Sequence, residues 1–174
     1  DLDEDAFRTE LGIPNNQKVI ALLPGSRKQE INKILPVMIS VIDSFPNHRF
    51  VIAGTSNIDK SLYKRFAPNV DVVMDRTYDV LRIAQAAIVT SGTATLETAL
   101  LKTPQIVCYK ASPLSFAIAK RIVKLPFVSL VNLIAGRLLV QELIQKDCNA
   151  FAFTNALQEI LSPVGRKKVL SGYN

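Results

Sequence analysis

The sequence contains no tryptophan, one histidine and two cysteines, and these scarcities exclude several classes of protein. Cys108 and Cys148 do not show the sequence spacing of metal ligands and give no disulfide framework, as expected of a reduced compartment. His48 has no catalytic motif around it, and we expect a solvated loop residue rather than a general base. No apolar run reaches the length of about 18 residues that a membrane span needs, and no secretory signal opens the chain.

What the chain does contain is enough apolar sequence for a full core. Of its 174 residues, 48% are hydrophobic and 21% are charged, which is typical of one globular domain that folds without a disulfide or a metal. The formal net charge is +6, so the favoured partners are anionic: nucleotide phosphates, anionic lipid or nucleic acid. The basic residues are dispersed and lack interleaved aromatic residues, which argues against nucleic acid.

Short apolar runs alternate with helical patterns along most of the chain. Residues 1–16 are acidic and then rich in Gly, Pro and Asn, so we expect a linker remnant, with helix only at 6–11, before a domain at 17–174. Strands separated by helices predict right-handed crossovers and a Rossmann-like parallel sheet covered on both faces. The expected strands are 18–23, 50–53, 70–74, 86–89 and 104–109, and the expected helices between them are 31–42, 62–66, 80–84 and 93–101. After Tyr109 the pattern predicts helices only, at 114–123, 138–145 and 155–161.

The first turn that could bind a ligand follows the first expected strand and reads Pro24-Gly25-Ser26-Arg27. Open parallel sheets bind ligands at the carboxyl ends of their strands, where this turn would lie. Gly25 permits a close backbone approach, Ser26 offers a hydroxyl and an amide, and Arg27 offers a planar fork of donors for phosphate. An ordinary strand–helix turn with a solvated Arg27–Lys28 pair explains the same residues.

The second turn follows the fourth expected strand and reads Thr90-Ser91-Gly92-Thr93-Ala94-Thr95, with Glu97 close behind. Small residues at a helix start leave amides free, and the positive end of the helix dipole favours a diphosphate. Glu97 could accept hydrogen bonds from ribose hydroxyls, although acidic residues are also common in first turns because of the dipole alone. The turn is neither a Walker A motif nor G-x-G-x-x-G, so we expect no dinucleotide cofactor.

Both turns, in this order, make the chain resemble the lipid-A-disaccharide synthase family, bacterial glycosyltransferases with the two-domain GT-B architecture. The resemblance continues through Val107-Cys108-Tyr109-Lys110, through 126–137 and through Glu142-Leu143-Ile144-Gln145, and it covers essentially the whole chain. It implies an α/β fold, the C-terminal nucleotide-sugar-binding half of a GT-B enzyme, with a Rossmann-like parallel sheet flanked by helices.

The family transfers 2,3-diacylglucosamine from its UDP carrier to 2,3-diacylglucosamine 1-phosphate, which forms the lipid A disaccharide and releases UDP without a metal or other cofactor. The resemblance therefore implies UDP-2,3-diacylglucosamine and an acylated glucosamine 1-phosphate as partners. It implies a cytoplasmic protein, peripheral on the inner membrane, and leaves room for a homodimer. The half of the family fold that holds the acceptor site and the proposed base is missing, so we expect an excised piece that is inactive by itself.

The resemblance also assigns roles in donor binding. Gly25, Ser26, Arg27 and the Ser91–Thr95 turn would hold the diphosphate, and Glu97 would hold the ribose. The segment Cys108-Tyr109-Lys110 would lie near the uracil, although Cys108 by itself is typical of a small core residue. Asn132 and Arg137 would also line the UDP side of the cleft. We expect no catalytic residue and no metal ligand in this chain.

Two rival functions are kept beside this one. The first is another UDP-sugar enzyme of the same fold, such as a UDP-N-acetylglucosamine 2-epimerase, against which the segment 128–137 argues. The second is a nucleotide-binding module without catalysis. The basic residues of 116–124 alternate with apolar ones, which fits either a face for an anionic membrane or a solvated helix with a core stripe.

Overall fold

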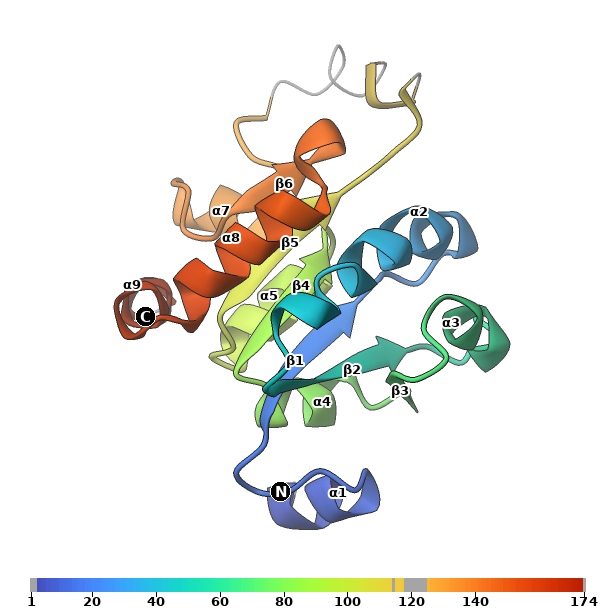
Figure 1. Ribbon diagram of the computed structural model, residues 1–174. Helices are drawn as coiled ribbons and strands as arrows, with labels where there is room; N and C mark the ends of the chain where they lie inside the picture. The colour runs from blue at the N-terminus through green and yellow to red at the C-terminus, as the bar shows by residue number, and fades with distance from the viewer. Residues whose placement is uncertain (1–2, 114, 118–124, 174) are drawn as a thin grey trace.

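The computed structural model describes residues 3–113, 115–117 and 125–173, and its centre is a six-stranded sheet (Figure 1). All five pairings are parallel, and the strand order is β3-β2-β1-β4-β5-β6. The chain builds one side of the sheet from β1 to β3 and then returns to the other side of β1 with β4. The strands are β1 (Lys18–Leu23), β2 (His48–Gly54), β3 (Asp71–Met74), β4 (Ala86–Thr90), β5 (Gln105–Tyr109) and β6 (Glu142–Ile144).

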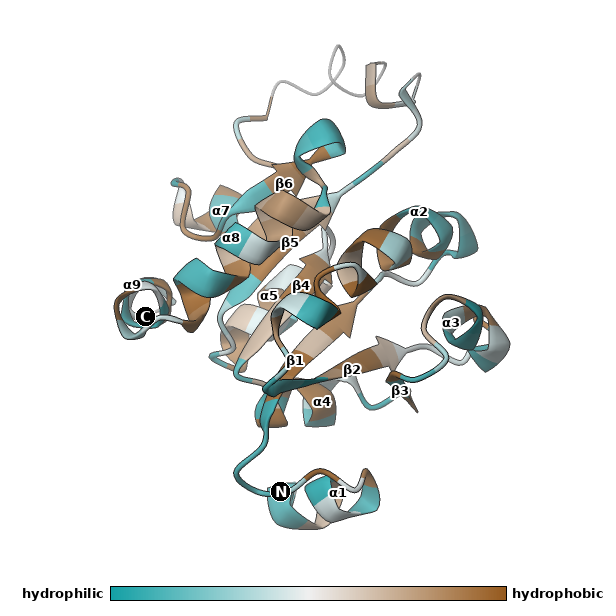
Figure 2. Cartoon of the chain, viewed as in Figure 1, coloured by the Kyte–Doolittle hydropathy of each residue, from teal (hydrophilic) through white to brown (hydrophobic). Residues whose placement is uncertain are grey.

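Helices cover both faces of the sheet, because alternate residues of the buried strands point to opposite faces. Ile20 and Leu22 of β1 belong to a core cluster with Ile31 and Leu35 of α2, while Val19 and Ala21 belong to a second cluster. Figure 2 shows that the central strands of the sheet are mainly hydrophobic. The helices are α1 (Glu4–Glu10), α2 (Lys28–Ile39), α3 (Lys60–Phe66), α4 (Thr77–Ile83), α5 (Ala94–Leu100), α7 (Leu130–Ala135), α8 (Ala150–Leu161) and α9 (Pro163–Gly172), with 3-10 turns at Ile42–Ser44 and Gln145–Asp147. The expected α/β, Rossmann-like architecture is confirmed.

The region after β5 differs from expectation. The helix expected at 138–145 is wrong, because Glu142–Ile144 form β6 and pair in parallel with β5. Val140 and Leu143 are buried against the main core there, which a strand at the sheet edge achieves as well as a helix would. Helices α7 and α9 were not expected, whereas α8 was. Most of the helix expected at 114–123, with its basic residues, lies outside the described residues.

The first sixteen residues include a packed helix. Helix α1 starts after Asp3, whose side chain accepts a hydrogen bond from the Ala6 amide at 3.0 Å. Phe7 is 2% exposed and lies in the second core cluster, and the Arg8 Nη2 donates to the Ile83 carbonyl at 3.1 Å. This segment is therefore tied to the sheet domain, and its expected role as a linker remnant stays a prediction.

Cys108 and Cys148 are both free thiols and both buried. Burial raises the pKa of Cys108 well above its ordinary value, and the thiol hydrogen bond with Cys108 lowers the pKa of Cys148. Cys108 packs in the main core, as a small core residue does. His48 is not a loop residue: it is half-buried at the start of β2, and burial lowers its pKa.

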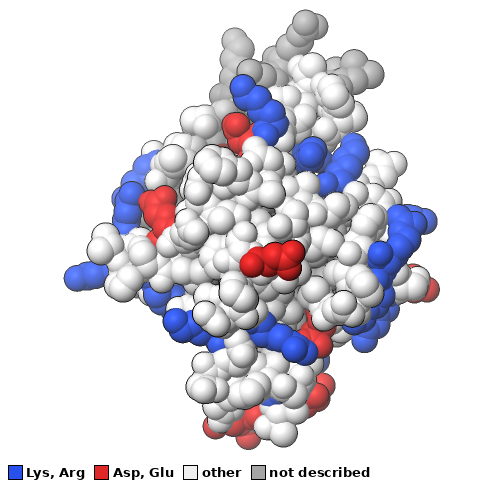
Figure 3. Space-filling model, in the orientation of Figure 1, with Lys and Arg blue, Asp and Glu red and all other residues white. Residues whose placement is uncertain are grey.

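On the face seen in Figure 3, lysine and arginine side chains form separate groups around the edges rather than one continuous patch. None of the helices in the described ranges is both long and apolar enough to cross a membrane.

Candidate functional site

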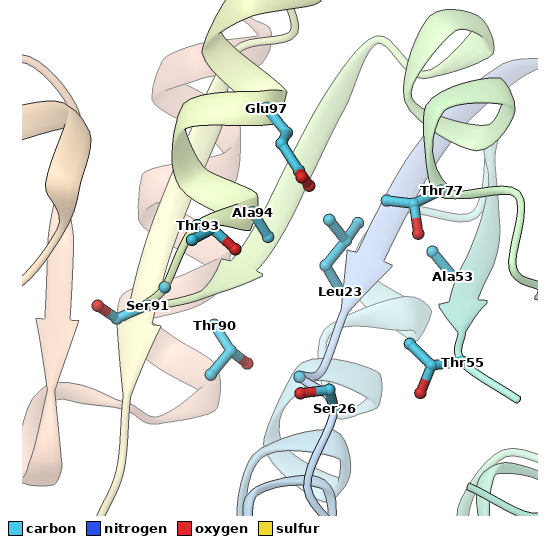
Figure 4. Close-up of a pocket in the computed structure, with 12 residues that line it drawn as sticks. Leu23, Ser26, Ala53, Thr55, Thr77, Thr90, Ser91, Thr93, Ala94 and Glu97 are labelled. Carbon is cyan, nitrogen blue, oxygen red and sulfur yellow. The ribbon is translucent and has the colours of Figure 1, made fainter. Parts of the chain in front are cut away.

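A pocket lies at the carboxyl ends of β1, β2 and β4, where the strand order changes direction (Figure 4). This is the position at which open α/β sheets bind ligands. Its volume of about 250 Å³ is below the range of about 300–1,000 Å³ that is usual for complete ligand sites, so it would hold only part of a larger ligand. Its lining residues are Leu23, Gly25, Ser26, Ala53, Thr55, Thr77, Thr90, Ser91, Gly92, Thr93, Ala94 and Glu97.

The first turn reaches the pocket through Gly25 and Ser26. Gly25 has φ of +96°, a backbone conformation that strains any other residue, and a Cβ there would also require the Oε2 of Glu30, 2.7 Å away, to move. The Asn57 Nδ2 donates to the Ser26 carbonyl at 2.9 Å and ties this turn to the one after β2. Arg27 lies outside the lining: its side chain is 81% exposed, and its Nη1 is 3.5 Å from Oε1 of Glu30.

The second turn supplies amide donors. Among the described residues, the amides of Gly92, Thr93 and Ala94 have no hydrogen-bond acceptor, and they stand at the start of α5. The Thr95 amide turns inward to the Gly92 carbonyl at 3.2 Å, and its hydroxyl donates to the same carbonyl at 2.8 Å. Three free amides at the positive end of a helix suit an anion such as a diphosphate.

Glu97 is the carboxylate of the pocket. Its side chain extends from α5 towards Leu23 and Thr77 (Figure 4). The hydroxyl of Tyr78 donates to Oε1 of Glu97 at 3.2 Å, and the negative charge of Glu97, followed by that hydrogen bond, raises the pKa of Tyr78. A carboxylate in this position can accept hydrogen bonds from ligand hydroxyls.

A second hollow continues the pocket past Glu97. It shares Thr55, Thr77 and Glu97 with the first and extends along the turn between β3 and α4, from Asp75 to Asp79. That turn is fixed from several sides. The Ser56 amide donates to Oδ1 of Asp75 at 2.8 Å, and Nε of Arg76 donates to Oδ2 of Asp79 at 2.7 Å. The two hollows together form a groove with amide donors at one end and Glu97 in its middle.

Several residues assigned to the site from the sequence are not brought to the pocket. The side chains of Thr95, Cys108 and Asn132 are fully buried, at 0% exposure, and bonded within the protein. Arg137 is exposed, and it does not line the pocket, nor do Tyr109 and Lys110. The pocket does unite Gly25 and Ser26 with the Ser91–Ala94 turn and Glu97.

Thr55, Thr77 and Thr90 line the pocket and were missed as site residues. Thr55 and Thr77 belong to no recognisable motif, whereas Thr90 opens the second turn that the sequence indicates. Thr90 and Thr55 could have been found, because they stand at the carboxyl ends of the expected strands 86–89 and 50–53, which share one edge of a parallel sheet. Thr77 comes from the start of α4, and its approach depends on how the β3–α4 turn folds.

The described residues contain no group of three or more His, Cys, Asp and Glu side chains that could hold a metal ion. None of the residues that line the first pocket is a lysine or an arginine, and Arg76, which lines the second hollow, is paired with Glu10 and Asp79. Amides, hydroxyls and one carboxylate are therefore the polar groups that this pocket offers to a ligand.

The fold, a parallel sheet covered by helices on both faces, is that of one half of a GT-B glycosyltransferase. Similar solved structures include Anabaena HepE in complex with UDP and glucose, with a TM-score of 0.60 and 13% identity over 99% of this chain and 45% of that chain. Spinosyn rhamnosyltransferase SpnG, complexed with thymidine diphosphate, has a TM-score of 0.59 and 17% identity over 90% and 39%. The E. coli ADP-heptose LPS heptosyltransferase II has a TM-score of 0.57 and 9% identity over 91% and 50%.

The chain belongs to the lipid-A-disaccharide synthetase family, whose model matches residues 1–170. It is 38% identical to lipid-A-disaccharide synthase of Sulfurihydrogenibium sp. strain YO3AOP1, over 92% of this chain and 46% of that protein. It is 40% identical to lipid-A-disaccharide synthase 1 of Legionella pneumophila strain Lens, over 85% and 41%. The chain thus spans less than half the length of these curated relatives.

Proposed function

We propose that this chain is the UDP-sugar-binding part of a lipid-A-disaccharide synthase. The complete enzyme would transfer 2,3-diacylglucosamine from UDP-2,3-diacylglucosamine to 2,3-diacylglucosamine 1-phosphate, with UDP as the leaving group. One observation carries this proposal: the free amides at Gly92–Ala94 and the Glu97 carboxylate lie in the same groove. That groove is at the edge of the sheet where the strand order changes direction. Family membership supports the sugar donor, and the groove supports the part that binds it.

The groove would act on the reaction by stabilising the departing diphosphate. Negative charge accumulates on the UDP oxygens as the bond to the sugar breaks, and fixed donors aimed at that charge lower the barrier. The amides after β4 and the dipole of α5 would supply those donors, with Ser26 from the facing turn. Arg27, whose side chain is exposed and only loosely paired with Glu30, is free to swing towards the phosphates and adds the positive charge that the pocket lining lacks.

The nucleoside would lie along the second hollow. With the diphosphate at the Gly92–Ala94 amides, the ribose reaches the Glu97 carboxylate, and the base continues towards Thr77 and Tyr78. Tyr78 is 53% exposed and offers an aromatic face on which a base can stack. This path differs from the uracil position expected at Cys108-Tyr109-Lys110, which stays a prediction; the Cys108 side chain is fully buried.

The acceptor, an acylated glucosamine 1-phosphate, and the catalytic base would be held by the remaining half of the enzyme. We propose this other half as a partner of the chain, because the relatives are more than twice as long as the chain. Because the substrates would carry acyl chains, the complete enzyme would associate peripherally with the cytoplasmic face of the inner membrane. A homodimer is a further proposed assembly.

The proposal predicts that UDP binds more tightly than UMP. The second phosphate would meet the free amides and the helix dipole, and such contacts contribute about 0.3–1 kcal/mol each at exposed sites. We therefore expect an affinity ratio of about threefold or more in favour of UDP by titration calorimetry. ADP carries the same diphosphate on a different base, so comparing its affinity with that of UDP measures the contribution of the base. Equal affinities for UDP and UMP would remove the diphosphate role from both turns.

A further inference from the structure

Glu142 of β6 is the most heavily hydrogen-bonded carboxylate in the described part of the chain. Its Oε1 accepts from the Ser129 amide at 2.9 Å, the Ser129 hydroxyl at 2.7 Å and Nδ2 of Asn132 at 2.8 Å. Its Oε2 accepts from the Val128 amide at 2.9 Å. The side chain is half-buried, so these four donors replace water around a full negative charge.

The backbone of Glu142 is held independently of its side chain. Glu142 pairs with Val107 in the β5–β6 register, and the Val107 amide donates to the Gln141 carbonyl at 2.9 Å. The carboxylate therefore projects from the sheet at a defined place. It fixes the segment that enters α7, where Ser129 is the N-cap residue.

The Val128 peptide carries this restraint into the nucleotide pocket. The Val128 N–H donates to Oε2 of Glu142, and the next peptide group, formed by the Val128 carbonyl and the Ser129 N–H, is held at both ends. Its N–H donates to Oε1 of Glu142 at 2.9 Å, and its carbonyl accepts a hydrogen bond from the Ser91 hydroxyl at 2.9 Å. The Ser91 amide donates to the Cys108 carbonyl at 2.9 Å, so Ser91 is held from two sides. In Figure 4 the Ser91 hydroxyl points away from the centre of the pocket, which agrees with a positioning contact rather than a ligand contact.

We propose that Glu142 is a positioning residue for donor binding, which acts through Val128 and Ser91 on the turn that holds the diphosphate. The inference rests on the proposed function. Glu142 touches no ligand in this arrangement. It sets the Val128 carbonyl, that carbonyl orients Ser91, and Ser91 leads directly into the free amides at Gly92–Ala94.

The two oxygens of Glu142 accept hydrogen bonds from different donors, so a substitution can remove the contacts of one oxygen and keep those of the other. In Glu142→Gln the remaining oxygen would take the Oε1 position, because three donors meet there. The new amide group then faces the Val128 N–H, and two donors cannot bond to each other. Glu142→Gln therefore removes the link to Val128 and keeps the contacts to Ser129 and Asn132.

Ser129→Ala is the matched control. It removes the α7 cap and one hydrogen bond to Oε1, and it leaves the bond between Val128 and Oε2 in place. Both variants should lower the thermal midpoint. We expect Glu142→Gln to weaken UDP binding by about threefold to fivefold, the effect of losing one ordinary hydrogen bond, and Ser129→Ala to leave it unchanged.

Ser91→Ala tests whether Glu142 influences UDP binding through Val128 and Ser91. In the Ser91→Ala background, Glu142→Gln should cause no further loss of UDP affinity, because the contact that it acts through is already gone. Independent, multiplying losses in the double variant would overturn the proposal, as would normal UDP binding by Glu142→Gln.

Amide exchange without ligand separates this proposal from the proposed function. We expect the Ser91 amide, which donates to the Cys108 carbonyl, to exchange faster in Glu142→Gln than in Ser129→Ala or the parent chain. Equal exchange in the two variants overturns the positioning role whatever the ligand. Failure of the parent chain to bind UDP overturns the proposed function, and the exchange result then still decides whether Glu142 positions the turn.

Discussion

Glu97→Gln is expected to weaken UDP binding by about tenfold or more and to leave the thermal midpoint close to that of the parent chain. A carboxylate that accepts hydrogen bonds from ribose hydroxyls contributes about 1.5–3 kcal/mol, and about 1.4 kcal/mol corresponds to a factor of ten in affinity. A first-turn acid that only meets the helix dipole would contribute about 0.3–1 kcal/mol to stability and nothing specific to a ligand. Titration calorimetry and thermal unfolding of both chains measure the two quantities.

Two controls isolate the ribose contact. Tyr78→Phe removes the hydroxyl that donates to Glu97 at 3.2 Å and keeps the aromatic ring, so it tests whether that internal contact matters. For 2′,3′-dideoxy-UDP, which lacks the hydroxyls, Glu97→Gln should change the affinity little. A variant that melts early but binds UDP normally would leave Glu97 with a helix-start role only.

Asn132→Ala is expected to lower the free energy of unfolding by about 3 kcal/mol or more, and its UDP affinity, measured on the folded fraction, should stay much closer to the parent value. The Asn132 side chain donates to the Val140 carbonyl and to Glu142, and its oxygen accepts from the Leu139 and Val140 amides, each at 2.8–2.9 Å. Alanine would leave these groups without their partner in a buried place, at about 1–3 kcal/mol for each group left unsatisfied.

Chemical denaturation measures the change. Asn155→Ala is the matched control, because Asn155 is exposed on α8, and it should shift stability by less than about 0.5 kcal/mol. A stable Asn132→Ala protein that no longer binds UDP would contradict this prediction and give Asn132 a role in UDP binding, by direct contact or through Glu142.

The sequence was sufficient to predict the five longer strands because each is a short, nearly continuous apolar run bounded by turn residues. Strand β6 was not predictable in this way. Leu138, Leu139, Leu143 and Ile144 also fit a helical spacing, and the three residues Glu142–Ile144 become a strand through pairing with β5 and through contacts that the Glu142 carboxylate makes far back in the chain. Such non-local partners leave no local pattern.

The candidate site was predictable where it depends on turns and less so where it depends on side-chain direction. Gly25, Ser26 and the Ser91–Ala94 turn follow strands, and parallel strands bring such turns to one edge. Asn132 has the polarity of a ligand-binding residue, yet its side-chain amide is hydrogen-bonded to the Val140 backbone inside the protein. Whether a polar side chain faces a groove or closes an internal network depends on its tertiary neighbours, which the residue type does not reveal.

The burial of both cysteines has a practical consequence for a chain without tryptophan. Cys108 pairs with Thr90 in the sheet register, directly behind the pocket lining, and a thiol reagent can reach it only when the fold opens. A ligand that binds only the folded chain stabilises it by about 2.7 kcal/mol at a concentration of 100 Kd. The rate of thiol labelling would then fall by up to about a hundredfold as the pocket fills. The two native thiols therefore allow nucleotides and inhibitors to be screened by their protection against alkylation, without any engineered reporter residue.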